Sequence, residues 1–420
     1  MNKKLLILFF IYLVLEGALR KWFLPEYNNL LFLLKDIILI LSFIYLLLKP
    51  KESKFASSFF TEKNKLIWIV FVLFILLFGL LKEFDNLTII GWRYYLVSIP
   101  LIALVPTYFY KDLRKYAFIY LILALPVLLL GIYQYFNPQN SVINKYAWTA
   151  AETKIAVFGD DRPRITSTFS YITPYTVYLQ TIALLCWIYI IKSDNRKALF
   201  ITITILFLTF ANLIMTGSRA PLLLSVILSL PFIYYYIRLS KNRLNILAIG
   251  IVLTLLSINL LVDPFNSFQD RTKKADDTDL RAYGALLTPY ITLSTVDFIG
   301  SGLGTTFLGT RELFKKDLRT FFDEVNQDRV GVEVGIIGYL LFLFIKMYFL
   351  IKTFFLIRRV NNYEIKLWLW FSLTVQLSSV WMIPIFNSLA ATYYFVAIGI
   401  YYLMRKKHIE GTKHKTGIIN

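Results

Sequence analysis

The chain has 420 residues, of which 57% are hydrophobic and only 17% are charged, and its formal net charge is +19. Soluble domains carry about 25% charged residues, so this composition excludes an ordinary soluble enzyme and also a disordered chain. A positive charge of this size suggests nucleic acid as a partner of a soluble protein, whereas in a membrane protein it anchors cytoplasmic loops. A single Cys excludes a disulfide framework and a Cys-based metal site.

Apolar segments long enough to cross a membrane, which takes about 20 residues, recur along the whole chain. The first is a retained span and not a cleaved signal peptide, because Arg20, Lys21 and Trp22 follow it in place of a small-residue cleavage site. The sequence therefore predicts an all-α, polytopic transmembrane helical bundle that forms a single domain over residues 1–420. We expect about twelve spans, near 5–19, 30–48, 66–81, 88–106, 116–136, 171–191, 198–216, 220–237, 244–262, 331–351, 367–383 and 386–404.

Lysine and arginine residues in the loops predict the orientation of these spans. If the N-terminus is cytoplasmic, 25 of the 45 basic residues fall on inner segments and every short inner loop is basic. Three basic residues, Lys35, Arg93 and Lys346, fall inside spans, and the remaining 17 lie outside. We therefore expect both termini in the cytoplasm.

Two expected outer segments are much longer than the other connections. One is an outer loop at 137–170, and the other is a long extracytoplasmic loop at 263–330. Loops of more than about 15 residues are usually functional or disordered. The second loop contains apolar residues at helical spacing between Arg281 and Val296, which predicts a short helix at the outer membrane surface. No internal repeat is visible, which disfavours transporter folds built from repeated halves.

Four arginines lie at the expected outer boundary or in the outer loops. They are Arg93 in GWRYYL, Arg164 in RPRITSTF, Arg219 in TGSRAP and Arg281 in DLRAYG. The guanidinium group offers a rigid fork of donors that grips phosphate oxygens in pairs, so several arginines converging on one outer site would suit a lipid-linked diphosphate. The alternative for each of them is snorkelling to lipid headgroups. Arg219 is the best exception, because Gly217 and Ser218 precede it between two spans.

An acidic segment lies just before the tenth expected span. Glu324 and Asp328 belong to it, Arg329 follows, and Glu333 comes one turn further on. A carboxylate here could take a proton from a sugar hydroxyl as a general base. The alternative is a solvated helix start, because acidic residues are favoured in the first turn of a helix.

Other polar patterns predict structure rather than chemistry. Asp276, Asp277 and Asp279 are spaced like metal ligands but follow two lysines in a polar loop, which favours a solvated loop. The Gly-rich run at 300–304 predicts a tight turn and not a dinucleotide site, because no strand precedes it. Glu16 and Arg20 are four residues apart and can pair on one helix face. Cys186 is expected to pack inside a span.

Several motifs resemble one known family. The chain is similar to the O-antigen ligase and O-antigen polymerase superfamily of bacterial polytopic membrane glycosyltransferases, most clearly from about 160 to 345. EGALRKWFLP (16–25) is similar to a segment of exopolysaccharide members, and the other N-terminal residues match only as generic spans. The motifs that carry the resemblance are RITSTFSYITPYTVYL (164–179), TGSRAPLLL (216–224), DLRAYGALLTPYITLSTVDFIGSGLGTTF (279–307) and EVNQDRVGVEVGIIGYLLF (324–342).

This resemblance implies a metal-independent glycosyltransferase, with no cofactor, at the outer leaflet of the bacterial inner membrane. Its donor would be a glycan on a polyprenyl diphosphate, and the lipid diphosphate would be the leaving group. Arg164, Arg219 and Arg281 occupy the matching motif positions and would hold that diphosphate, with Arg93 as a further candidate. The implied partners are the lipid-linked donor and acceptor, membrane lipids and, as a candidate, a chain-length regulator protein, with no nucleic acid.

The chain departs from the family pattern at one informative place. Ligases that transfer glycan to the lipid A core carry a His about nine residues before the Glu of the last motif, and Glu324 stands at that spacing before Glu333. Both His residues, His408 and His414, fall in the expected cytoplasmic tail. In addition, Ser167 stands where a Gly is common in the family. The missing outer His favours a polymerase over a ligase.

The sequence therefore suggests a repeat-unit polymerase of the O-antigen, capsule or exopolysaccharide type. Glu324 or Asp328 would be the catalytic base, the arginines would bind the diphosphate, and Arg329 and Glu333 would support the site. Within the superfamily, the alternative is a ligase-type transferase to another acceptor. Outside it, the alternative is a lipid-linked oligosaccharide flippase or exporter, which should carry charges within its spans. A scaffold protein has no positive support.

Overall fold

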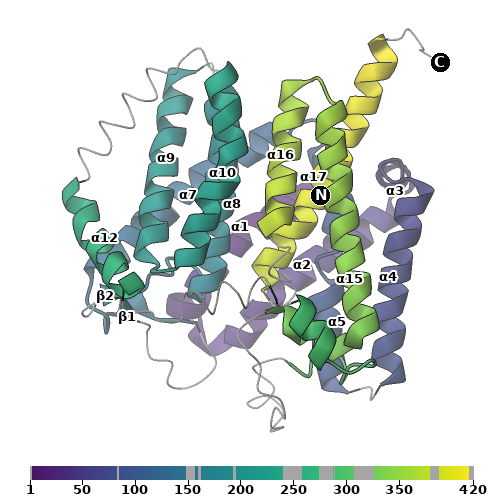
Figure 1. Ribbon diagram of the computed structural model, residues 1–420, viewed down its shortest axis with the longest axis horizontal. Helices are drawn as coiled ribbons and strands as arrows, with labels where there is room; N and C mark the ends of the chain where they lie inside the picture. Colours follow the sequence, from purple (N-terminus) through teal and green to yellow (C-terminus); the bar gives the residue numbers. More distant parts are fainter. Residues whose placement is uncertain are drawn as a thin grey trace. The chain divides into compact units, whose positions relative to one another are not determined.

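The structure of the chain is a computed structural model. It describes residues 2–82, 85–147, 157–158, 162–192, 195–239, 258–273, 287, 289–306, 326–378 and 387–415. Most of these residues are helical, and the only strands among them are two short ones (Figure 1). The predicted all-α class is confirmed to that extent.

The N-terminal helices are α1 (Asn2–Ala18), the π-helical turn η1 (Leu19–Phe23), the 3₁₀ turn η2 (Pro25–Tyr27), α2 (Asn28–Leu48), α3 (Pro50–Ser57), α4 (Glu62–Leu81), α5 (Asn86–Leu96), α6 (Leu101–Phe109) and α7 (Leu113–Phe136). The remaining elements are η3 (Val142–Asn144), β1 (Val157–Phe158), β2 (Arg162–Pro163), α8 (Ile172–Lys192), α9 (Arg196–Met215), α10 (Arg219–Leu239), α12 (Ile258–Lys273), α15 (Asn326–Arg359), α16 (Tyr363–Ser378) and α17 (Ser388–Lys415).

Eight helical segments of the described residues are long and apolar enough to cross a membrane, and all eight coincide with predicted spans. They are Pro25–Leu48, Glu62–Leu81, Asn86–Phe109, Leu113–Phe136, Ile172–Lys192, Arg196–Met215, Arg219–Arg238 and Arg329–Arg359. Of the other predicted spans, 5–19 lies in α1, 386–404 falls mainly on α17, 367–383 overlaps α16, and 244–262 falls mainly outside the described residues. The chain is therefore a multi-pass protein by the length and composition of its helices.

The exposed surfaces of these helices are apolar. On α10, Leu223, Ile227, Leu230 and Tyr234 repeat at helical spacing and each is about half exposed or more. An exposed apolar stripe of this kind is unfavourable in water but suits a helix that faces lipid. Buried polar residues such as Asn212 lie inside instead, which is the arrangement expected of a membrane protein.

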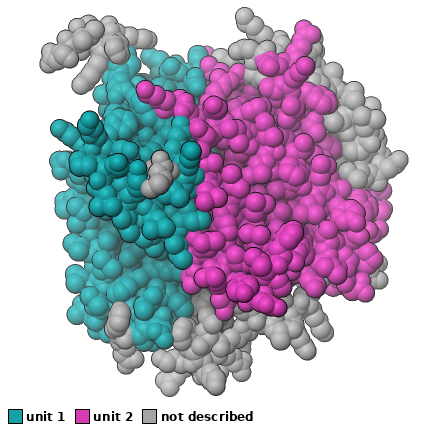
Figure 2. Space-filling model, turned by 180° about the vertical axis from the view of Figure 1, so that it is seen from behind, with its two compact units in different colours: residues 1–5, 36–110, 277–420 teal, residues 6–35, 111–276 magenta. Residues whose placement is uncertain are grey.

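The chain divides into two compact units, each assembled from separate stretches of sequence (Figure 2). Unit 1 comprises residues 1–5, 36–110 and 277–420, and unit 2 comprises residues 6–35 and 111–276. Composition gives no sign of this division, because both units share the same apolar, helical character.

Unit 2 is organised around α8, which packs against both α9 and α10, and the three helices lie side by side (Figure 1). A polar junction joins α7, α8 and α9. The Asn212 side chain on α9 donates to the Leu128 carbonyl oxygen at 3.1 Å and accepts from the Tyr175 hydroxyl at 2.7 Å. Gly131 on α7 lies directly against this junction. In an apolar environment such interhelical hydrogen bonds contribute roughly 0.6–2 kcal/mol each.

Unit 1 has an aromatic core between α4, α15 and α17. The Trp68 ring stacks on the Phe349 ring with centroids 5.2 Å apart, and its indole N–H donates to the Tyr402 hydroxyl at 3.2 Å. On α16, the Ser372 hydroxyl donates to the Ala397 carbonyl oxygen of α17 at 2.6 Å. Large aromatic contacts supply packing, and a few polar contacts fix the register of neighbouring helices.

The two long outer segments contain more regular structure than loops. Residues 157–158 and 162–163 pair as antiparallel strands within the predicted loop 137–170, a small departure from an all-α fold. The helix α12 ends at Lys273, beyond residue 262, where the sequence places the end of a span. Its apolar Val262 and Phe265 repeat at helical spacing among polar residues, which allows the helix to continue as an amphipathic one.

The predicted helix at 281–296 is helical over residues 289–295, while its first residues lie outside the described part. Residues 303–306 form the tight turn that the Gly-rich run predicts, with φ of +119° at Gly302 and +76° at Gly304. Cys186 is buried inside α8, as expected.

The polar junction of unit 2 generates a first prediction. A Cβ atom at Gly131 would overlap the Asn212 side-chain oxygen, which two interhelical hydrogen bonds hold in place. Gly131→Ala should therefore lower the free energy of unfolding by about 1–3 kcal/mol, measured from thermal unfolding of the purified protein in detergent. Gly411→Ala is the matched control, because nothing lies within 4 Å of a Cβ atom there. Equal thermal midpoints for the two variants would contradict the prediction.

Candidate functional site

Two of the segments singled out in the sequence meet in unit 2. Arg164 lies just after β2, and its Nε atom donates to the Thr216 carbonyl oxygen at 2.8 Å. Its Nη2 atom donates to the Ser218 hydroxyl at 2.9 Å. The arginine-led segment and the Ser-Arg segment, which are more than 50 residues apart in the sequence, thus form one structure.

The turn between α9 and α10 explains why Arg219 stands at this point. Gly217 has a φ of +64°, which a residue with a Cβ atom rarely adopts, and this allows a sharp reversal after Thr216. Arg219 is the first residue of α10 and is half-buried. Arg164 and Arg219 therefore lie at a helix N-terminus, where backbone N–H groups and the helix dipole also favour an anion.

The chain that carries Arg164 turns sharply three residues later. Ser167 has a φ of +47°, the only positive value of a non-glycine residue in the described part of the chain. The Gln134 side-chain oxygen accepts from the backbone N–H groups of Thr166 (3.2 Å) and Ser167 (2.6 Å). The Ser167 hydroxyl donates to the Val127 carbonyl oxygen at 2.6 Å. Ser167 thus holds a conformation that glycine adopts more readily than a residue with a Cβ atom.

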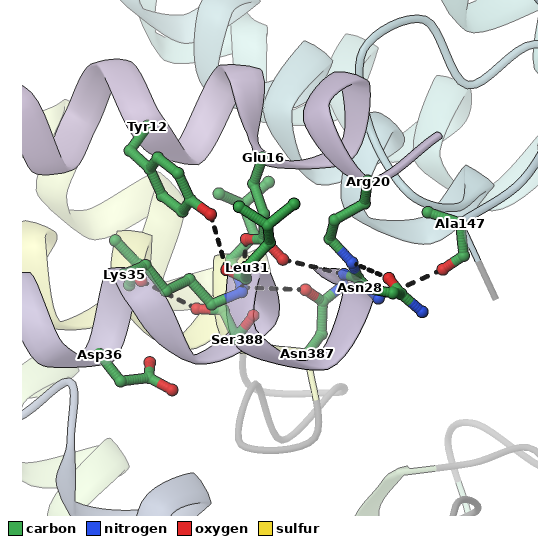
Figure 3. Close-up of polar contacts among 12 residues, drawn as sticks. Tyr12, Glu16, Arg20, Asn28, Leu31, Lys35, Asp36, Ala147, Asn387 and Ser388 are labelled. Atoms are coloured by element: carbon green, nitrogen blue, oxygen red, sulfur yellow. Dashed lines mark hydrogen bonds and ion pairs between the residues drawn. The ribbon is translucent and has the colours of Figure 1, made fainter. Parts of the chain in front are cut away.

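A buried ion cluster lies at the N-terminal end of unit 2 (Figure 3). The predicted pair of Glu16 and Arg20 is confirmed, with the guanidinium nitrogen 2.9 Å from one carboxylate oxygen. The Lys35 amine of α2 lies 2.6 Å from the other carboxylate oxygen, so one carboxylate serves two cations. Arg20 also donates to the Asn28 side chain and to the Ala147 carbonyl oxygen. All three charged side chains are at least nine-tenths buried.

In unit 1, the carboxylate of Glu333 is completely buried rather than solvated. One oxygen accepts from the Thr306 backbone N–H (3.1 Å) and hydroxyl (2.6 Å), and the other accepts from the Tyr95 hydroxyl (3.0 Å). The interpretation of Glu333 as part of a solvated helix start was therefore wrong. Through these bonds Glu333 fixes the end of the Gly-rich turn to α15.

The contact between the Gly-rich turn and α15 also explains a break in this helix. Gly335 has a φ of +69° inside this helix, and a Cβ atom there would overlap the backbone of Phe298 and Gly300. The Gly-rich turn fills the gap, because the Ser301 N–H donates to the Val332 carbonyl oxygen (2.7 Å). A broken helix at membrane depth is tolerated only where other protein groups satisfy its backbone.

Arg93 on α5 is engaged by a carboxylate. Its Nε atom donates to Asp36 of α2, and both side chains are largely buried. The guanidinium carbon also lies 5.3 Å from the centre of the Tyr94 ring. Asp36 therefore offsets the positive charge of Arg93 within the fold.

The remaining candidates are only partly described. Glu324 and Arg281 lie outside the described residues, and Asp328 belongs to α15 without a described side chain. Arg329 is half-buried in the first turns of α15. The candidates thus belong to two groups, with Arg164 and Arg219 in unit 2 and Arg93, Arg329 and Glu333 in unit 1.

Sequence reasoning missed the residues that hold these candidates in place. Gln134 and Asp36 are polar residues inside apolar helices, a signal of function or buried pairing. Lys21 is also buried, with hydrogen bonds to the segment that carries Arg164. Burial lowers the pKa of the Lys21 amine well below its ordinary value, since the charged form loses its hydration.

Comparisons with known proteins add no family assignment. No protein-family model matches the chain, and no curated protein matches it with significant similarity.

The ion cluster generates a second prediction. Glu16→Gln leaves both Arg20 and Lys35 buried without their anion and should lower the free energy of unfolding by about 3–5 kcal/mol. Lys35→Met is the matched variant, because Glu16 keeps its pair with Arg20, and it should cost less. Thermal unfolding in detergent compares the two. The interpretation fails if Lys35→Met is the more destabilising substitution.

Proposed function

We propose that the chain is a polysaccharide repeat-unit polymerase, of the O-antigen, capsule or exopolysaccharide type, that works at the outer face of a bacterial inner membrane. The observation that carries the proposal is the arginine pair of unit 2. Arg164 is held by two hydrogen bonds beside the start of α10, where Arg219 is the first residue. Both arginines belong to segments that resemble the family of O-antigen ligases and polymerases.

The chemistry needs a positively charged group at the leaving group. The hydroxyl oxygen of the acceptor's terminal sugar attacks the anomeric carbon of the donor glycan, and the bond from that carbon to the diphosphate oxygen breaks. The polyprenyl diphosphate leaves with the bonding electron pair, and the hydroxyl proton passes to Glu324 or Asp328. Arg164, Arg219 and Arg281 would stabilise the charge that develops on the diphosphate.

The hydrogen bonds of Arg164 suit this role for an electrostatic reason. Groups that are already oriented when charge develops lower the barrier most, because they do not reorganise during the reaction. The Thr216 carbonyl and the Ser218 hydroxyl orient the guanidinium before a substrate arrives. Lysine at this position could not replace both contacts, since it lacks the planar fork of donors.

A ligase-type transferase would use the same donor and the same arginines with a different acceptor. Purified protein supplied separately with lipid-linked repeat units and with other candidate acceptors distinguishes the two, because only a polymerase extends the lipid-linked chain.

A flippase or exporter of lipid-linked oligosaccharides is the candidate from another class. One observation favours it, namely that Lys35 and Lys346 are buried charged residues inside predicted spans, where charges often line a translocation path. Lys35, however, is paired with Glu16. Proteoliposomes that translocate a labelled lipid-linked glycan without forming a glycosidic bond would favour this candidate.

The third prediction concerns the arginine pair. Arg164→Ala and Arg219→Ala should each slow polymerisation of purified lipid-linked repeat units on the order of 10²–10³-fold, because each removes a donor to the developing charge. Arg238→Ala is the control, since Arg238 is an exposed arginine at the opposite end of the same helix, and it should keep the wild-type rate. Full chain growth by a protein that carries both Arg219→Ala and Glu324→Gln would refute the assignment of the site.

The fourth prediction concerns the side of the membrane. Asn140 and Lys51 are both exposed, and the expected topology puts them on opposite faces. In a Cys186→Ser background, Asn140→Cys should react with a membrane-impermeant thiol reagent in intact cells, and Lys51→Cys only after permeabilisation. The reverse pattern would put Arg164 and Arg219 on the cytoplasmic side and would rule out the proposed reaction.

A further inference from the structure

Lys21 follows α1 in the π-helical turn η1, and its side chain points into unit 2. The amine donates to the Thr166 hydroxyl at 3.1 Å and also to the Ser167 carbonyl oxygen. The residue is only 5% exposed. A buried amine needs such partners, because burying a polar group without them is costly. The Lys21 amine thus donates these hydrogen bonds to a turn 145 residues away in the sequence.

That turn contains the left-handed residue Ser167, and a non-glycine residue in this conformation costs about 1–3 kcal/mol. The surroundings must hold it in place. Gln134 binds the two N–H groups of the turn, and Lys21 binds a hydroxyl and a carbonyl oxygen of the same two residues. On α1, Gly17 lies so close to the backbone of residues 168–170 that a Cβ atom at this position would overlap it. The turn is therefore clamped from α1 and from α7.

Arg164 lies directly before this clamped turn and is also held at its own carbonyl group. Its carbonyl oxygen accepts from the Tyr146 hydroxyl at 3.0 Å, and the clamped turn begins two residues later at Thr166. The backbone that carries the guanidinium is thus held at Arg164 itself and at the turn that follows. If the turn relaxed, the backbone after Arg164 would shift and carry the guanidinium with it.

We propose that Lys21 is a positioning residue: it holds the left-handed turn at Ser167 and thereby sets Arg164 in place for the anionic leaving group of the substrate. This inference rests on the proposed function for the role of Arg164. Lys21 does not bind the substrate, since its amine is buried and bonded to Thr166 and Ser167.

The test uses the strain at Ser167. Lys21→Met keeps the length of the side chain and removes its donors. Glycine adopts a positive φ without strain, so Ser167→Gly should make the turn less dependent on the clamp. We expect Lys21→Met to lower kcat/KM for the lipid-linked donor on the order of 10- to 100-fold, and by less than about threefold in the Ser167→Gly background. A general loss of stability would not be relieved by this second substitution.

Lys35→Met is the matched control. Lys35 is also a buried lysine of unit 2, but it pairs with Glu16 and not with the turn. Any loss of kcat/KM that Lys35→Met causes should be the same with and without Ser167→Gly. All rates are measured at least 10 °C below each variant's thermal midpoint. If Lys21→Met does not fold, Lys21→Leu, which also lacks donors, replaces it in the same comparison.

Two results would overturn the inference. One is wild-type kcat/KM in Lys21→Met, and the other is an equal loss with and without Ser167→Gly. If the wild-type chain does not polymerise lipid-linked repeat units, the proposed function fails, and thermal midpoints then judge the clamp. In that case, the clamp is supported if Ser167→Gly raises the thermal midpoint of Lys21→Met but not that of Lys35→Met. Equal effects of Ser167→Gly on the two midpoints would overturn it.

Discussion

Backbone polar groups that are buried away from water need hydrogen-bond partners, and several features of this structure follow from that constraint. The backbone groups of a regular helix bond to one another, so other partners are needed mainly where the chain is irregular. At Ser167 the side chain of Gln134 binds two buried backbone N–H groups. At the Gly335 break the Gly-rich turn binds the freed carbonyl oxygens. At Gly217 a guanidinium binds the last carbonyl before the reversal. The resembled motifs coincide with these irregular places.

Buried charged groups in this protein also have bonding partners. The net charge of +19 belongs mainly to segments that the sequence predicts to be cytoplasmic, where it sets orientation. The few charges inside the units are bonded to specific partners, as Lys35 is to Glu16 and Arg93 is to Asp36. Arg164 is bonded to a carbonyl oxygen and a hydroxyl, and these two contacts orient its guanidinium group.

The fold was more predictable than the site. Hydropathy predicted eight helices that the structure contains, because a span is a local property of about 20 residues. The predicted ends were less accurate. The helix α12 continues past 262 and α15 is broken at Gly335, since amphipathic continuation and packing against a distant turn leave no clear hydropathy signal. For the site, the sequence pointed to Arg164 and Glu333, but not to Gln134, whose bonds to the turn span more than 30 residues.

The sequence by itself determined the class of the protein, a helical multi-pass chain, because apolar composition and helix length decide that locally. It also singled out the arginines that we propose for binding a diphosphate. The tertiary structure alone decided how these charges are used. It paired Arg93 with a carboxylate, buried Glu333 against Thr306, and brought Lys21 to the turn beyond Arg164. Such pairings depend on which distant segments come into contact when the chain folds, and neither spacing nor composition predicts those contacts.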